Sequence, residues 1–315
     1  MSLVAVTELR ELSLSAGAKA GSPAYLSAAS GLVQLGSNAY VIADDELHLG
    51  VFPLDGPGPG RLIRIFDGVL PDDRGERKRQ KPDFESLALL PPFQGFPHGG
   101  LLALGSGSRP NRGRGALLGL DKHGSVHRPG HGLDLSPILA PLSTVFAELN
   151  IEGAVVAGDE FCLFQRGNRR HPENAIMRYP LSRILAALRD PPTDIIEPAA
   201  IHRPDLGSID GVPFCFTDAS ALPDGSIAFC AVAEDTEDAY RDGPCLGGAV
   251  GIVGVDGRLL SLQRLDRPFK VEGISSRTVA DGLEVLLVTD ADDPAVPAML
   301  LSTSMTGRPM HSLCE

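Results

Sequence analysis

The chain has 315 residues, of which 43% are hydrophobic, and its 40 acidic and 28 basic side chains give a net charge of −12 at pH 7. This acidic balance argues against a general nucleic-acid binder or a binder of anionic membranes, and it makes a cation the more natural partner. The 36 glycines and 26 prolines indicate many turns and short strands rather than long helices.

The N-terminal segment has no charged, apolar, small-residue leader pattern, and no uninterrupted apolar run reaches the length of about 18 residues that spans a bilayer. The cysteines form no C-x-x-C pair, so neither a zinc knuckle nor a disulfide framework is indicated. They are Cys162, Cys215, Cys230, Cys245 and Cys314. We therefore expect a cytoplasmic protein with reduced thiols.

Five segments share one pattern, in which a serine or an acidic residue is followed by a small residue and then by alternating apolar positions. In chain order these anchors are Ser30, Glu85, Glu152, Asp218 and Glu272, with spacings of 55, 67, 66 and 54 residues. Each spacing accommodates four strands and their turns, which is the size of one propeller blade. The sequence therefore predicts an all-β fold, a five-bladed β-propeller of four-stranded antiparallel blades.

The remaining strands can be read between the anchors. A second apolar strand follows each anchor, at 39–45, 101–108, 161–168, 227–235 and 283–290. Third and fourth strands are readable at 47–54 with 61–66 and at 249–255 with 259–265. The last repeat lacks a fourth strand, whereas residues 4–13 have nothing to pair with. We expect this N-terminal strand to complete the last blade, so that residues 1–315 form a single propeller domain.

Three segments stand apart from this strand pattern. Residues 135–149 and 179–189 have helical periodicity and are predicted as helical insertions on the rim. The basic run 74–81 is interpreted as a solvated loop, which would matter to function only if it lay near the site. An overlooked repeat within 110–150 would give six blades instead of five.

In a propeller the innermost strand runs along the channel and the second strand returns beside it, so each anchor lies near the end of the next strand. We therefore expect the five anchors to form an acidic ring at one mouth of the channel. Polar residues at the ends of the second strands would surround this ring. They are Asp44, Asp45, Ser106, Ser108, Arg109, Gln165, Arg166, Asn168, Glu234, Asp235, Asp290 and Asp292.

Carboxylates gathered in a narrow channel repel one another, and either raised pKa values or a bound cation must relieve that repulsion. Several carboxylates with a serine hydroxyl form a hard oxygen donor set that suits Ca²⁺, or Mg²⁺ as the alternative, better than zinc. The predicted metal ligands are Ser30, Glu85, Glu152, Asp218 and Glu272. The alternative is that these anchors only hydrogen-bond backbone amides where blades meet.

Guanidinium groups follow two of the second strands and could clamp an anionic group near the metal. The predicted substrate-binding residues are Arg109, Arg166, Asn168 and Arg169, and Arg112 belongs to the same set of arginines. The candidate general bases are Asp44, Asp45 and Glu234.

At the anchors the chain resembles the calcium-activated nucleotidases, which are apyrase-type five-bladed propellers. The resemblance lies in the motifs Lys270-Val-Glu-Gly-Ile274, Ser30-Gly-Leu, Ala39-Tyr-Val-Ile-Ala-Asp-Asp45, Glu152-Gly-Ala-Val and Gln165-Arg-Gly-Asn-Arg169. It implies a central calcium ion on Ser30, Glu85, Glu152 and Glu272, and hydrolysis of nucleoside di- and triphosphates at the same mouth.

The resemblance has three departures. The family pattern has serines in the fourth repeat, where this chain has Phe216-Thr-Asp-Ala-Ser220, so Asp218 as a ligand is an extrapolation. The family is secretory and this chain shows no leader pattern, and no tryptophan is present to stack a base. The chain is also similar to bacterial propeller proteins of unknown function, so nucleotide specificity is not carried over.

The leading hypothesis is a metal-dependent hydrolase of a phosphorylated or otherwise anionic small molecule. A rival from another class is a non-catalytic binding module or scaffold, whose central ion would only lock the blades together. A third hypothesis is a glycosidase, which needs two carboxylates across a cleft and aromatic platforms, and an aromatic content of 5% makes such platforms scarce.

Overall fold

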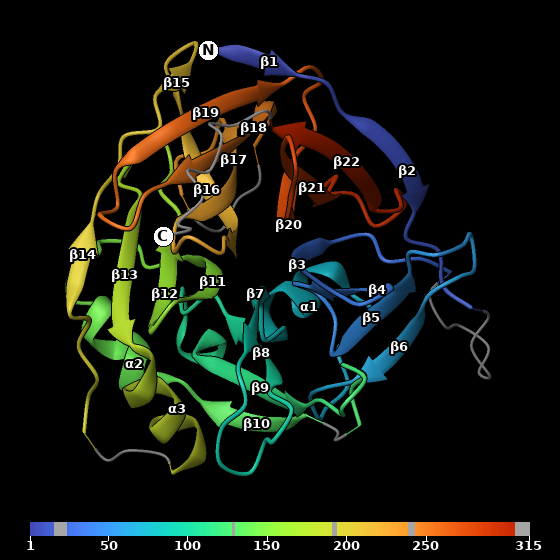
Figure 1. The fold of residues 1–315 in the computed structure, drawn as a ribbon, viewed down its shortest axis with the longest axis vertical. Helices are drawn as coiled ribbons and strands as arrows, with labels where there is room; N and C mark the ends of the chain where they lie inside the picture. The colour runs from blue at the N-terminus through green and yellow to red at the C-terminus, as the bar shows by residue number, and fades with distance from the viewer. Residues whose placement is uncertain (16–23, 128–129, 191–193, 239–242, 306–315) are drawn as a thin grey trace.

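The computed structural model describes residues 1–15, 24–127, 130–190, 194–238 and 243–305. Their strands form five antiparallel blades around a central channel (Figure 1). The prediction of a five-bladed propeller is confirmed. The six-blade alternative is wrong, because residues 110–150 supply the two outer strands of the second blade and a helix instead of another blade.

Each blade runs from an innermost strand at the channel to an outermost strand at the rim. Blade 1 is β3 (Ala29–Leu35), β4 (Asn38–Ala43), β5 (His48–Pro53) and β6 (Arg61–Arg64), and blade 2 is β7 (Phe84–Leu90), β8 (Gly100–Gly105), β9 (Arg114–Gly119) and β10 (His131–Asp134). Blade 3 is β11 (Ile151–Ala157), β12 (Glu160–Gln165), β13 (Ala175–Pro180) and β14 (Ala200–His202). Blade 4 is β16 (Val212–Ala221), β17 (Ile227–Glu234), β18 (Cys245–Val253) and β19 (Leu259–Leu265), with the short β15 (Ser208–Ile209) paired to β16. Blade 5 is β20 (Val271–Val279), β21 (Gly282–Thr289), β22 (Met299–Met305) and β2 (Thr7–Glu11).

The N-terminal segment closes the ring, as predicted. Strand β2 pairs antiparallel with β22 and so supplies the fourth strand of blade 5. The structure adds a pairing that the sequence did not reveal, because β1 (Ser2–Val4) runs parallel to β19 at the outer edge of blade 4. The first eleven residues therefore join two blades, and Val6 between these strands packs into the core that the two blades share.

The hydrophobic core consists of five clusters, one at each interface between neighbouring blades. Strand β12 shows why the second strands are continuously apolar. Phe161 and Leu163 pack toward blade 2, whereas Cys162 and Phe164 pack toward blade 4. Because successive side chains point to opposite faces, a strand between two blades must be apolar at every position.

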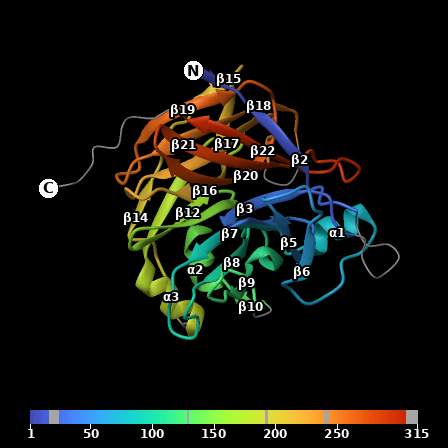
Figure 2. The same ribbon diagram turned by 45° about the vertical axis from the view of Figure 1, so that its right-hand side comes forward.

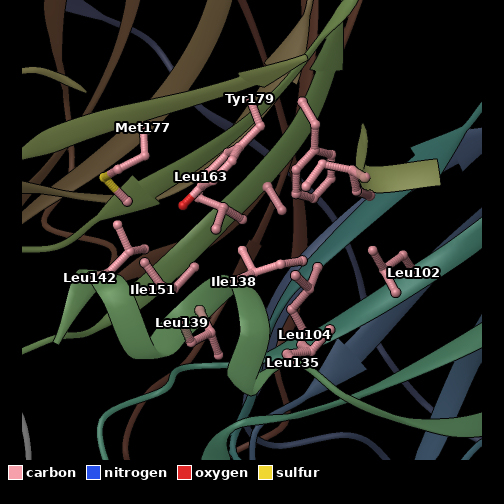
Figure 3. Packing of buried hydrophobic residues seen from close by; sticks show 14 of the residues in the cluster. Leu102, Leu104, Leu135, Ile138, Leu139, Leu142, Ile151, Leu163, Met177 and Tyr179 are labelled. Carbon is pink, nitrogen blue, oxygen red and sulfur yellow. The ribbon is translucent and has the colours of Figure 1, made fainter. Parts of the chain in front are cut away.

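Two helices belong to the core between blades 2 and 3 and do not merely decorate the rim. Helix α2 (Ser136–Leu142) buries Ile138, Leu139 and Leu142 against it (Figure 3). Helix α3 (Leu181–Arg189) buries Ile184 and Leu188 in the same core. The predicted helix 135–149 is wrong beyond Leu142, where a turn follows, and Pro141 in the last turn has no N–H to donate. The predicted helix 179–189 begins two residues late because Tyr179 and Pro180 still belong to β13.

The basic run is also a helix rather than a loop. Helix α1 (Arg74–Gln80) begins at Asp73, whose side chain accepts a hydrogen bond from the Glu76 amide, and it buries none of its residues. It lies against blade 1, where Arg77 donates to the Asp45 carbonyl and to Glu46 Oε1, and apart from α2 and α3 (Figures 1 and 2). A short 3-10 turn, Pro110–Arg112, follows blade 2's second strand.

Two further expectations from the sequence concern membrane-spanning segments and the state of the cysteine thiols. Within the described ranges, the helices are all too short or too polar to cross a membrane. Cys162, Cys215 and Cys230 are buried free thiols and Cys245 is a partly exposed one, whereas Cys314 lies outside the described residues.

Candidate functional site

The five innermost strands share one local irregularity. In each blade the register between the innermost and second strands shifts by one residue, which leaves one residue of the innermost strand without a partner. Such a β-bulge re-aims the side chain of the unpaired residue. The bulged residues are Ser30, Glu85, Glu152, Thr217 and Glu272, and we call them the axial ring.

The axial ring contains four of the five predicted anchors, but the fourth blade requires a correction. Its bulged residue is Thr217, and the predicted anchor Asp218 is the next residue, paired with Cys230. The alternation of apolar residues in 218–223 concealed this shift of one position. The Thr217 hydroxyl donates to the Val271 carbonyl at 2.7 Å.

Asp218 instead joins three blades from within the channel. Its Oδ2 accepts hydrogen bonds from the amides of Ile274 (2.9 Å) and Leu32 (3.3 Å), on blades 5 and 1. The residue is fully buried, and Oδ1 has no hydrogen-bond partner within the described part of the chain. Burial raises the pKa of Asp218 well above its ordinary value, which favours the neutral acid.

Glycines directly after the axial ring bring the innermost strands together. A Cβ on Gly31 would lie 3.0 Å from the Leu87 nitrogen, and one on Gly153 would lie 3.3 Å from the Asp218 Cα, each on the next blade. Gly273 is equally close to blade 1. The small residue of the repeat is thus required by the close approach of backbones, and this approach crowds the ring side chains together.

A guanidinium group lies among three of the glutamates. Arg166 Nη1 is 3.2 Å from Glu152 Oε2 and 3.2 Å from Glu272 Oε2, and Nη2 contacts Glu234. The side chain of Arg166 is only 10% exposed. Arg166 was predicted to clamp a substrate, but in this structure it neutralises the protein's own carboxylates.

A lysine completes this half of the mouth. Lys270 Nζ is 2.6 Å from Asp292 Oδ1, 3.5 Å from Glu234 Oε1 and 3.7 Å from Glu272 Oε1. The surrounding carboxylates hold the pKa of Lys270 well above its ordinary value despite burial, so the ammonium stays charged. Two buried protein cations therefore compensate much of the acidity that the sequence predicted.

The other half of the mouth is an acidic cluster around one lysine. Oxygen atoms of Asp44, Asp83 and Glu85 all lie within 4.8 Å of one another. Lys81 Nζ contacts Asp44 and lies 3.0 Å from Asp83 Oδ1, and Arg112 Nη1 lies 2.8 Å from Asp83 Oδ2. No hydrogen bond to the Glu85 carboxylate is formed by the residues that the structure describes.

The carboxyl groups of the mouth resist ionisation. Burial raises the pKa of Glu152 to about 8, in spite of Arg166. Burial and the neighbouring Glu152 and Asp83 raise the pKa of Glu85 well above its ordinary value. Burial and the charge of Asp44 do the same to the pKa of Asp290. Burial is the main cause of these shifts and neighbouring carboxylates add to them, so an additional cation would favour the ionised forms.

Two hollows lie side by side at the mouth and share part of their lining. The first, the central pocket, has a volume of about 80 Å³ and is lined by Ser30, Glu85, Glu152 and Glu272 of the ring. The second, the side cavity, has a volume of about 500 Å³ and lies between the loops of blades 5 and 1 beneath α1. Both hollows are lined by Asp44, Lys78, Lys81, Asp290 and Asp292.

The structure brings some predicted site residues together and separates others. Asp44, Glu234, Arg166 and Asn168 line the central pocket with the ring, whereas Asp45 lines the side cavity. Arg109 lines a different hollow together with residues 143 and 146–149. Arg169 is about half exposed and pairs with Asp235 at 2.7 Å.

Sequence reasoning missed Asp83 and did not use Lys270, which had been noted only within a motif. Both stand two residues before a ring glutamate but just outside the strands, which begin at Phe84 and Val271. Asp83 has a positive φ of 58°, and the ring glutamates are bulged, so strand alternation alone does not predict where these side chains point. Lys81 and Thr217 were missed because their placement depends on α1 and on the bulge in β16.

Fold and site together define a five-bladed propeller with a charged axial ring. The chain belongs to the family described as "Family of unknown function (DUF6929)", whose model matches residues 25–305. No curated protein matches the sequence.

Solved structures with a similar chain course have low sequence identity. A luciferin-regenerating enzyme is 10% identical with a TM-score of 0.47, over 90% of this chain and 94% of that one. Glutaminyl cyclase of Myxococcus xanthus is 10% identical with a TM-score of 0.47, over 96% and 99%. Neither likeness assigns an activity to this chain.

The raised pKa of Glu152 predicts a pH-dependent stability. An acid with a higher pKa in the folded chain holds its proton more tightly when folded, so its contribution is full below the unfolded value of 4.5 and is lost as pH rises through about 8. In chelator-treated protein, the Tm of wild type minus that of Glu152→Gln should fall between about pH 5 and about pH 9. Parallel melting profiles for the two proteins would contradict the assignment.

The position of Asp218 predicts different effects for two substitutions. Asp218→Asn keeps an acceptor for the two amides and should change the free energy of unfolding by less than about 1 kcal/mol. Asp218→Ala leaves both buried amides without that acceptor and should cost about 2–5 kcal/mol. Urea denaturation measures both values, and equal losses would show that the hydrogen bonds are not what matters.

Proposed function

We propose that this protein is a metal-dependent hydrolase of a phosphorylated or otherwise anionic small molecule, and that its axial ring binds a divalent cation, Ca²⁺ in preference to Mg²⁺. The observation that carries the proposal is the axial ring itself. All five bulged residues carry an oxygen atom, and three of them are carboxylates with raised pKa values. A ring of this kind is costly to the fold unless it binds something positive.

The donor set fits a hard cation. The ligands would be Ser30, Glu85, Glu152 and Glu272, with Thr217 as a hydroxyl in the fourth blade and Asp218 no longer required. Carboxylate and hydroxyl oxygens in an irregular arrangement suit Ca²⁺, which accepts six to eight oxygen ligands, better than the strictly octahedral Mg²⁺. The Ser-Glu-Glu-Thr-Glu order also agrees with the resemblance to calcium-activated nucleotidases, whose fourth repeat has serines.

A bound cation would polarise an anionic substrate and lower the pKa of a water molecule beside it. The residues of this chain supply the rest of the chemistry. Asp45 is the general base that we favour, because it lines the side cavity and because burial and the charges of Asp44 and Glu46 raise its pKa to about 6. Such a carboxylate is ionised at neutral pH and still basic enough to accept a proton. Asp45 faces Arg77 at 3.6 Å, whereas Asp44 and Glu234 are in closer contact with Lys81 and Arg166.

A non-catalytic scaffold is the second candidate, and one observation favours it. Arg166 already bridges Glu152 and Glu272, so two of the three ring carboxylates are paired without any ion. The glycosidase hypothesis gains no such support. The described lining of the central pocket contains no aromatic side chain, and that of the side cavity contains only Tyr25.

Calorimetric titration of chelator-stripped protein with Ca²⁺ tests the proposal. We expect wild type to bind one ion per chain and Glu152→Gln and Glu272→Gln to lose at least about tenfold in affinity, because each removes a charged ligand. Glu284→Gln is the matched control, since Glu284 is exposed on the same blade as Glu272 and pairs with Arg277. Asp45→Asn should keep the calcium affinity and lower kcat on a phosphate-ester substrate by about 100-fold or more.

Three results would decide between the two candidates. Wild-type protein that binds neither Ca²⁺ nor Mg²⁺ favours the scaffold and ends the hydrolase proposal. Calcium binding that all three Glu→Gln variants retain places the ion outside the axial ring. Calcium binding without turnover of phosphate esters, carboxylate esters or anhydrides leaves a metal-binding scaffold.

A further inference from the structure

We propose that Arg166 is a displaceable counter-ion, which stabilises the axial ring without metal and leaves the ring glutamates when a divalent cation binds. This inference rests on the proposed function, because it names the residue that controls ion binding at the same ring. It changes the role of Arg166 from the substrate clamp that the sequence suggested to a group that sets the affinity for the ion. Arg166 and the ion are then alternative partners of Glu152 and Glu272.

The Arg166 guanidinium already lies between these two glutamates. Nη1 is 3.2 Å from Glu152 Oε2, 3.2 Å from Glu272 Oε2 and 3.3 Å from Glu272 Oε1. The remaining oxygen of Glu152, Oε1, accepts a hydrogen bond from Asn150 Nδ2 at 2.6 Å. Because a guanidinium and a divalent cation repel each other at contact distance, the two cannot bind this pair of carboxylates together.

Glu234 gives the displaced guanidinium a partner outside the ring. It is the last residue of β17 and does not belong to the axial ring, yet it contacts the second amino group of Arg166, Nη2. Its Oε1 accepts a hydrogen bond from the Gly243 amide at 2.7 Å and lies 3.5 Å from Lys270 Nζ, so Glu234 is fixed from the other side. Arg166 can therefore leave the two ring glutamates and still keep a carboxylate partner.

The charges around Arg166 favour its exchange for a stronger cation. Three carboxylates, those of Glu152, Glu234 and Glu272, contact this one guanidinium, and Lys270 Nζ lies 3.5 Å and 3.7 Å from the last two. The pKa of Glu152 is nevertheless raised to about 8, because burial outweighs the effect of Arg166. A divalent cation carries twice the charge of the guanidinium and would compensate these carboxylates further.

This arrangement has a consequence for function. With Arg166 in the ring, Glu152 and Glu272 keep a partner when no metal is bound, so the fold does not depend on the ion. An ion must compete with the guanidinium, and this competition lowers the observed affinity. The ring can therefore exchange its ion without unfolding of the chain.

Titration of Arg166→Gln with Ca²⁺, by calorimetry on chelator-stripped protein, tests the inference. This variant should bind Ca²⁺ at least about tenfold more tightly than wild type, because the internal competitor is absent. Without metal, its Tm should lie at least about 4 °C below that of wild type, since two buried glutamates lose their partner. Saturating Ca²⁺ should remove this difference in Tm.

Two further variants serve as controls. Arg169→Gln is the matched one, because Arg169 lies in the same loop, is 51% exposed, pairs with Asp235 and does not line the central pocket. It should match wild type in both measurements. Arg166→Lys keeps the positive charge but lacks the guanidinium fork, so its calcium affinity should lie between those of wild type and Arg166→Gln. If Arg166→Gln folds only with Ca²⁺, the comparison of wild type with Arg166→Lys replaces it.

The outcomes separate this inference from the proposed function. A calcium affinity of Arg166→Gln equal to or below that of wild type would overturn the inference and leave the proposed function standing. Equal gains in Arg166→Gln and Arg169→Gln would show a general effect of net charge and would also overturn it. Calcium binding by Arg166→Gln but not by wild type would support the inference and end the hydrolase proposal. Binding by neither protein would overturn both.

Discussion

The close approach of the five innermost strands at the channel axis is the constraint on which the site depends. Gly31, Gly153 and Gly273 allow neighbouring backbones to come within contact distance of one another. The bulge just before each glycine turns one side chain into the remaining space. Because the same β-bulge occurs in all five blades, the polar side chain at this position of each repeat points toward the channel axis.

Gathering carboxylates at one point has an energetic cost, and the structure shows how the chain meets it. Arg166 and Lys270 neutralise the side of the mouth formed by blades 3, 4 and 5, and Lys81 and Arg112 neutralise the side formed by blades 1 and 2. The remaining cost appears as raised pKa values of Glu85 and Glu152, which are caused first by burial and then by neighbouring carboxylates. A divalent cation would compete with the Arg166 guanidinium for Glu152 and Glu272, so ion binding implies a movement of that side chain.

The architecture was predictable because propeller blades repeat. The anchors and the apolar second strands predicted the number of blades. The unpaired N-terminal strand predicted that the ring closes through blade 5. The parallel pairing of β1 with β19 was not predictable, since three residues at a sheet edge carry little pattern. The helix 135–149 was overextended because periodicity outweighed Pro141.

The site was predictable to the extent that it follows the repeat. Ser30, Glu85, Glu152 and Glu272 all line the central pocket. In the fourth blade a shift of one residue makes Thr217, and not Asp218, the bulged residue, and the alternation of apolar residues cannot locate a bulge. The basic segment 74–81 has no apolar face, so nothing in its sequence indicated a helix docked by ion pairs over the mouth. Charged contacts between loops that are far apart in the sequence produce no periodic pattern of residues from which they could be predicted.

A crystal structure of protein soaked in Mn²⁺, with the ion located by its X-ray absorption edge, tests the central claim most directly. The account predicts one peak on the channel axis, about 2.0–2.6 Å from oxygens of Glu85, Glu152 and Glu272, with the Arg166 guanidinium displaced from between the last two. An axial ring without a peak, in which Arg166 still bridges Glu152 and Glu272, would contradict it.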